Sequence, residues 1–413
     1  MTAAPRVSGA TSRILARLRP RRDKLPRDIK VMLAAAFLIA LGFGLVAPVL
    51  PQFATTFGVG NTEAAVIVAI FAFMRLIFAP AGGTLIGRLG ERPVYVAGLL
   101  IVAGSTAACA FAQDYWQLLL FRGLGGAGSV MFTVASMALV VRLAPPESRG
   151  RVSGAYASAF LIGNVCGPIV GGLLAGFGLR IPFLAYAAAL VIAAIVVQTQ
   201  LSHQRRGSRE SRDKAPDMRF GEALGTGAYR SALFSSFANG WVTFGVRMAT
   251  VPLFAAAAFG SGPEAAGLAL AVFAAGNAAA LTFSGRLADS LGRKPMMIWG
   301  LLVAGLATAG IGFTSDLGWF LAASAVAGIG SGLFGPAQQA AVADVIGNGR
   351  SGGKVLAVYQ MTSDVGAIVG PVLAGVLADR LGFGWAFGVT GGIMLVAAFT
   401  WLATRETLQS ARP

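Results

Sequence analysis

The run from Val31 to Leu50 reads VMLAAAFLIALGFGLVAPVL and contains no charged side chain. An α-helix rises about 1.5 Å per residue, so about 20 apolar residues cross the roughly 30 Å hydrocarbon core of a bilayer. The run is too long for the apolar region of a secretory signal peptide, and no small-residue cleavage site follows it. We therefore expect a membrane-spanning helix here that stays in the protein.

Eleven more apolar runs of similar length follow along the chain. The twelve expected spans cover residues 30–52, 64–87, 93–112, 115–142, 152–178, 181–200, 230–257, 264–287, 295–313, 316–346, 353–379 and 383–403. The composition agrees, because only 12% of the 413 residues are charged, whereas soluble proteins carry about 25%. The sequence therefore predicts an all-α integral membrane protein and excludes a soluble fold.

The basic residues predict how these helices are oriented. The net charge is +16, and nine Lys and Arg fall within residues 1–30 while seven more fall within residues 201–230. Cytoplasmic loops carry an excess of Lys and Arg, so we expect both termini to be cytoplasmic and the basic segments to contact anionic lipid. No aromatic side chains interleave with these charges as base stacking would require, which disfavours a nucleic-acid partner.

The two halves of the chain repeat at an offset of 202–203 residues. Phe111-Ala-Gln-Asp114 corresponds to Phe313-Thr-Ser-Asp316, and the segment 89–93 corresponds to 291–295. Since each half has six spans, an even number, both halves insert in the same direction, as in transporters built from parallel repeats. We expect two pseudo-symmetric six-helix bundles.

The repeat divides the chain into five parts. They are a basic cytoplasmic tail at 1–29, an N-terminal bundle at 30–200, a cytoplasmic linker at 201–229, a C-terminal bundle at 230–403 and a cytoplasmic tail at 404–413. Cys109 and Cys166 fall inside apolar runs, and His203 lies in the basic linker. This distribution predicts no disulfide framework, no metal site and no cofactor.

Four short patterns resemble those of the major facilitator superfamily. The loop after span eight, SGRLADSLGRK at residues 284–294, matches the superfamily signature GxLaDrxGrk, and Arg122 with Gly125, Gly126 and Gly128 resembles RxxqGxg. Residues 163–172 match GxxxGPxxGG, the antiporter motif, and residues 41–51 fit LGxxxxxPVxP of the twelve-helix drug:proton exporters. The chain is thus similar to the drug:proton antiporter family, which implies a secondary transporter and not an enzyme.

In this family, charges of the loop signature and at the end of span four or ten form a cluster that closes the cytoplasmic side. The resemblance assigns such a gating motif to Gly83, Gly87, Gly90, Glu91, Arg142, Asp289, Gly292, Arg293 and Asp344. In the N-terminal copy Gly87 replaces the first acid, and the signs of Glu91 and Arg142 are exchanged. Glu91 and Arg142 either form a pair of reversed polarity or are independent surface charges.

The antiporter motif comprises Gly163, Gly167, Pro168, Gly171 and Gly172. Gly163, Gly167 and Gly171 follow one another at intervals of about one helical turn, so they form a flat face for a neighbouring helix, and the proline kinks the span. The motif favours export. Ordinary helix packing is the alternative, because span eleven carries a similar series between Gly366 and Gly375.

Four ionisable residues lie deep inside spans, namely Arg75, Arg122, Arg247 and Asp364. Each costs about 2.5–3.5 kcal/mol at a helix centre, so we expect each to face a substrate cavity or a partner. Asp364 is the sole carboxylate among them and is our candidate for the proton-coupling site. A salt pair between Arg247 and Asp364 within the C-terminal half is the structural alternative.

These patterns predict a monomeric, proton-coupled exporter of small amphipathic compounds in the bacterial cytoplasmic (inner) membrane. Its partners would be a small-molecule substrate, protons and membrane lipids, and its two halves would rock about a site at the membrane midplane. The alternative is an uptake symporter or facilitator for a small organic anion, since the deep ionisable residues comprise three cations and one acid. No catalytic carboxylate pair, Ser/His set or metal cluster is present, which disfavours an enzyme.

Overall fold

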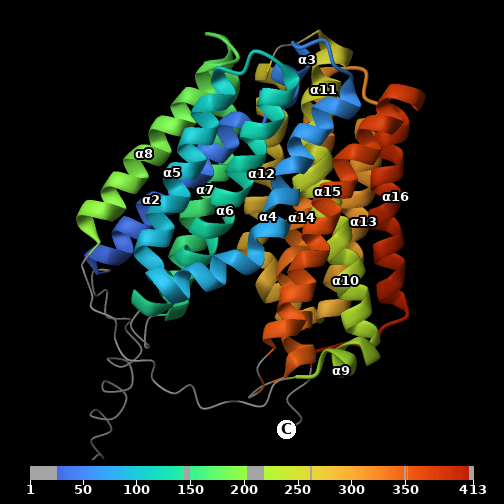
Figure 1. Ribbon diagram of the computed structural model, residues 1–413. Helices are drawn as coiled ribbons and strands as arrows, with labels where there is room; N and C mark the ends of the chain where they lie inside the picture. The colour runs from blue at the N-terminus through green and yellow to red at the C-terminus, as the bar shows by residue number, and fades with distance from the viewer. Residues whose placement is uncertain are drawn as a thin grey trace, which may run out of the picture.

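The structure is a computed structural model that describes residues 26–143, 149–201, 218–260, 263–347, 350 and 352–408 (Figure 1). The N-terminal half comprises α2 (Arg27–Val46), α3 (Leu50–Thr55), α4 (Asn61–Leu89), α5 (Glu91–Ala110), α6 (Tyr115–Leu143), α7 (Arg149–Ala175) and α8 (Ile181–Gln200). The C-terminal half comprises α9 (Phe220–Gly225), α10 (Gly227–Asn239), η2 (Gly240–Val246), α11 (Arg247–Phe259), α12 (Pro263–Leu291), α13 (Arg293–Ile311), α14 (Leu317–Ile346), α15 (Gly353–Leu381) and α16 (Phe383–Leu402). Most of the basic tail, the linker from 202 to 217 and residues 409–413 lie outside the described residues.

All twelve expected spans are confirmed as helices long and apolar enough to cross a membrane. Two of them are not continuous α-helices. The first span breaks between α2 and α3, around Pro48, because proline lacks an N–H and its ring clashes with the preceding turn. The seventh span contains the π-helical turn η2 between α10 and α11, which the sequence pattern does not predict.

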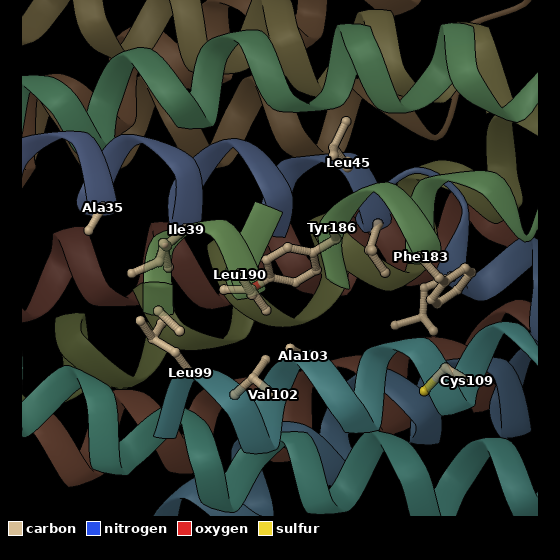
Figure 2. Packing of buried hydrophobic residues seen from close by; sticks show 14 of the residues in the cluster. Ala35, Ile39, Leu45, Leu99, Val102, Ala103, Cys109, Phe183, Tyr186 and Leu190 are labelled. Atoms are coloured by element: carbon tan, nitrogen blue, oxygen red, sulfur yellow. The ribbon is translucent and has the colours of Figure 1, made fainter. Parts of the chain in front are cut away.

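Each half has its own hydrophobic core, and this separation defines the two expected bundles. In the N-terminal bundle, α2, α5 and α8 meet, and Figure 2 shows Ile39 of α2, Val102 of α5 and Leu190 of α8 in one cluster. In the C-terminal bundle the fully buried Trp401 and Phe387 of α16 belong to the second core. The two bundles lie side by side in Figure 1.

The bundles meet along two antiparallel helix pairs, α4 with α15 and α7 with α12. We call them the α4–α15 seam and the α7–α12 seam. Both seams close at the end of the molecule that carries α3, which we call the α3 end, and the opposite end is the α9 end (Figure 1). At the α3 end Gln52 also donates a hydrogen bond of 3.2 Å from Nε2 to the backbone carbonyl of Pro252 in the other bundle.

Candidate functional site

The charges of the C-terminal gating motif come together at the α9 end. Arg293 is the first residue of α13, and it forms ion pairs with Asp289, one turn earlier in α12, and with Asp344 near the end of α14. The contact from Arg293 Nε to Asp344 Oδ2 is 3.3 Å. The turn before Arg293 requires Gly292, whose φ of 105° is a conformation that side-chain-bearing residues rarely adopt. The loop signature therefore positions one guanidinium between two carboxylates.

The segment after α16 packs against this cluster. Glu406 accepts hydrogen bonds from the backbone N–H groups of Arg293 (2.9 Å) and Lys294 (3.1 Å), and so caps the start of α13. Thr407 Oγ1 donates to Asp344 Oδ2 at 3.3 Å. Burial alone would raise the pKa of Glu406, but the hydrogen bonds from backbone N–H groups outweigh it and hold the pKa below its usual range.

Sequence reasoning missed Glu406 and Thr407. The available signal is chemical, because the first N–H groups of a helix need acceptors and a carboxylate shortly after the last span can supply them. The sequence pattern contains no indication that the acceptor for α13 comes from more than one hundred residues away.

The N-terminal copy of the gating motif shares the glycine turn of the C-terminal copy. Gly90 has a φ of 90°, matching Gly292, and Glu91 begins α5 as Arg293 begins α13. Arg92 donates to the carbonyl of Gln198 at the end of α8, as Lys294 Nζ donates to the carbonyl of Leu402 at the end of α16. The side chain of Arg142 lies outside the described residues, so the Glu91–Arg142 pair stays a prediction. Gly83 and Gly87 lie in the last turns of α4.

The antiporter motif packs α7 directly on the backbone of α2. A Cβ on Gly167 would lie 2.5 Å from the carbonyl oxygen of Leu41, and one on Gly171 would lie 2.2 Å from that of Leu45. Gly163 continues the same stripe, with Phe37 O at 2.7 Å from its Cβ position. Since real Cβ atoms do not approach this closely, side chains larger than hydrogen would force the helices apart.

The same stripe recurs in the other half. A Cβ on Gly366 of α15 would lie 2.1 Å from the carbonyl oxygen of Phe237 in α10. The glycine stripes are therefore bundle-packing devices in both halves. Gly172 faces the other bundle and lies beside Glu264 of α12, and the carbonyl oxygen of Pro168 lies beside Gly267, whereas the ring of Pro168 lies against Gly44 of α2.

Asp364 of α15 and Arg75 of α4 lie on opposite sides of the boundary between the bundles, where the charge of each influences the other although the two side chains form no ion pair or hydrogen bond. Arg75 lies fourteen residues after the start of α4 at Asn61, which is about 21 Å along the helix. Both side chains are half-buried. Arg75 Nη1 also donates to Ser129 Oγ of α6 at 3.0 Å, which anchors the guanidinium to its own bundle.

Arg122 and Arg247 are held differently, because each stacks on a phenylalanine of its own bundle. The guanidinium carbon of Arg122 lies 4.2 Å from the ring centre of Phe71, and that of Arg247 lies 3.6 Å from the ring centre of Phe273. The two rings occupy equivalent positions of the repeat. Arg122 is 8% exposed and Arg247 is 4% exposed, so both cations belong to the packed interior of their bundles.

The salt pair between Arg247 and Asp364 is not formed, and the guanidinium of Arg247 stacks on Phe273 instead. The π-helical turn η2 gives the physical reason. It inserts one residue into the turn before Arg247, and one residue corresponds to about 100° around a helix axis. Arg247 therefore points into its own bundle and onto Phe273. Among the described residues no three His, Cys, Asp or Glu side chains are grouped as a metal site requires.

Known proteins are similar to this chain in sequence. The family model for the Major Facilitator Superfamily matches residues 32–246 and again residues 232–413. The chain is 27% identical over 393 residues to Multidrug resistance protein 2 of Bacillus subtilis (strain 168), covering 92% of this chain and 96% of that protein. It is 31% identical over 185 residues to Quinolone resistance protein NorA of Staphylococcus aureus, covering 45% of this chain and 47% of NorA.

Solved structures with the same fold are also transporters. A bacterial homolog of the human lysosomal transporter Spinster, in an inward-facing and unoccupied conformation, superposes with a TM-score of 0.74 at 18% identity, covering 92% of this chain and 96% of that one. A D-xylose-proton symporter superposes with a TM-score of 0.75 at 16% identity, covering 92% and 98%. The repeated family match, the twelve spans and the two bundles lead to one conclusion: the chain belongs to the major facilitator superfamily and is a multi-pass membrane transporter of small molecules.

Proposed function

We propose that the protein is a proton-coupled exporter of small amphipathic compounds. The observation that carries this proposal is the position of Asp364, a half-buried carboxylate on the α4–α15 seam whose charge is influenced by Arg75 of the other bundle. The names of two relatives, a multidrug resistance protein and a quinolone resistance protein, support export of drug-like molecules.

Proton coupling follows from the position of this pair on the α4–α15 seam. When Asp364 is ionised, its attraction for Arg75 favours contact between the bundles. A proton on Asp364 removes that attraction, so the free energy of separating α4 from α15 falls. A proton that binds from one side of the membrane and leaves to the other would thus drive the rocking of the bundles.

The test is transport in everted vesicles under an imposed pH gradient. Asp364→Asn mimics the protonated side chain, so we expect uphill export to be lost while substrate exchange without a gradient is largely retained. Asp114→Asn is the matched control, because Asp114 lies outside the spans in the turn before α6, and it should transport normally. Uphill export by Asp364→Asn at the control rate would exclude Asp364 as the coupling residue.

We also propose the membrane topology and the division of the chain. The protein would reside as a monomer in the bacterial cytoplasmic membrane, with the bundles at 30–200 and 230–403 and with both termini and the linker in the cytoplasm, in contact with anionic lipid. The α9 end, which carries Arg88, Arg286 and Lys354, would face the cytoplasm, and the α3 end would face outward. Labelling single cysteines with an impermeant reagent on intact cells should modify position 114 and spare position 209.

Uptake of a small organic anion is the second candidate. Arg122 and Arg247 favour it, because Nε of both and Nη1 of Arg247 have no hydrogen-bond partner among the described residues. Such donors suit a carboxylate if the bundle opens to admit one. The direction of movement under the same pH gradient separates the two candidates, since an exporter and a proton symporter respond with opposite signs.

A further inference from the structure

One carboxylate joins the two bundles at the α3 end through four hydrogen bonds. Asp379, near the end of α15, accepts from the backbone N–H of Asn61 (3.1 Å) and from its side-chain Nδ2 (2.8 Å). It also accepts from the backbone N–H of Thr62 (2.9 Å) and from its Oγ1 (2.6 Å). Both Asn61 and Thr62 lie in the first turn of α4, in the opposite bundle.

These contacts form a helix cap supplied across the seam. The first N–H groups of a helix have no partner within it and carry the positive end of the helix dipole, so a carboxylate is the favoured acceptor. Most caps are local in sequence, whereas this acceptor is 317 or 318 residues away from the groups it binds. Separating the bundles therefore breaks all four hydrogen bonds at once and leaves the first N–H groups of α4 without this acceptor, whereas the Asp379 side chain is already exposed.

The backbones of α4 and α15 are closely packed next to this cap. A Cβ on Gly375, one turn before Asp379, would lie 2.8 Å from Thr62 Cα, so the two backbones are in direct contact. The other charged groups nearby do not compete for the same donors. Glu63 accepts from the N–H of Gly60 at 3.0 Å, and the side chain of Arg380 is exposed.

The equivalent place on the α7–α12 seam lacks the cap. The repeat offset puts Gly176 where Asp379 stands and Pro263 where Asn61 stands. Gly176 has no acceptor side chain, and Pro263 at the start of α12 has no N–H to satisfy. Within the described residues this polar lock is therefore found on the α4–α15 seam and not at the equivalent place of the α7–α12 seam.

We propose that Asp379 is the gate residue of the α3 end, which closes this end of the transporter by capping α4 and must release α4 each time that end opens. It is distinct from the coupling residue, because it lies fifteen residues beyond Asp364 on α15, about 22 Å along the helix. The gate works whatever the substrate or coupling ion, so its test is independent of the proposed direction of transport.

The experiment measures opening of the α3 end directly. Spin labels on cysteines introduced at Thr56 and Trp385, which are exposed positions on the two bundles, report the distance between the bundles in purified full-length protein whose native cysteines are replaced. Asp379→Asn should raise the ratio of long to short distances about tenfold, since hydrogen bonds to a charged group are among the strongest in proteins. Asn61→Ala, which removes one side-chain donor, should give a smaller shift in the same direction.

The matched control is Asp316→Asn. Asp316 caps α14 by accepting from Trp319 N at 3.1 Å, but donor and acceptor lie in the same bundle. This variant should keep the unmodified distance distribution. If Asp379→Asn and Asn61→Ala also keep that distribution, Asp379 does not hold the gate and the proposal fails.

Discussion

The two seams between the bundles differ in chemistry although the repeat relates them. Along the α4–α15 seam the first turn of α4 supplies donors to the acceptor Asp379, and Arg75 and Asp364 place opposite charges on the two bundles. The α7–α12 seam instead relies on small residues, with a Cβ on Gly267 only 2.4 Å from the carbonyl oxygen of Pro168. Leu161 and Gly176 occupy the positions equivalent to the two acids.

This contrast indicates that the two seams have different roles when the bundles move. Charges and hydrogen bonds switch on and off with protonation or hydration, so the α4–α15 seam is suited to be the switch. Close contact between backbones tolerates sliding and tilting but no added volume, so the α7–α12 seam is suited to be the hinge. The predictions below test the hinge, then the gating motifs of the two halves, and then the absence of a lock on the hinge seam.

The largest effect is expected from filling the hinge. Gly267→Val places side-chain atoms where the backbone of Pro168 lies, so the α7–α12 seam must part. We expect near-complete loss of transport in vesicles at normal expression. Gly310→Val, a glycine with no atom within 4 Å of its Cβ position, is the control and should remain active. Full activity of Gly267→Val would contradict the hinge.

An intermediate effect is expected at the N-terminal gating motif. Glu91→Arg and Arg142→Glu should each reduce the transport rate several-fold, because each creates two like charges where we predict a pair. The double exchange should restore much of the rate. A double variant as impaired as the single ones would show that these charges act independently.

The smallest effect is expected from adding an acid to the hinge seam. Gly176→Asp supplies a carboxylate at the position equivalent to Asp379, but Pro263 offers it no N–H, and the Cβ position of Gly176 lies 3.3 Å from the Glu264 carboxylate. We therefore expect no shift of the spin-label distances at the α3 end toward the closed state. A strong shift toward the closed state would mean that any acid at this end acts as a lock, and the contrast between the seams would then be lost.

Much of the fold follows from local sequence, because each span is a continuous apolar run and the same pattern of runs and motifs occurs in both halves. The cluster of Asp289, Arg293 and Asp344 is also predictable, since the loop signature places two of its members one helical turn apart. Asp379 is not, because a carboxylate at the end of a span has the pattern of an ordinary interfacial residue. Its partners belong to another bundle, and a single sequence does not reveal which helix ends meet.

The pairing of Asp364 shows a second limit. From the sequence, Arg247 is the alternative partner because it lies in the same half as Asp364. The choice depends on the π-helical turn η2, whose backbone fits against α15 so closely that a Cβ on Gly240 would lie 1.8 Å from the carbonyl oxygen of Ser363. Such a turn depends on tertiary packing and has no simple residue signature.

The stacking of Arg122 and Arg247 on rings of their own bundles has an electrical consequence. A charge that crosses the membrane potential gains or loses about 2.3 kcal/mol per 100 mV. Each arginine belongs to the same bundle as its ring, so it moves with that bundle and does not move separately through the field. The current measured per turnover should therefore count only protons and substrate charge, even though two permanent cations sit inside the membrane.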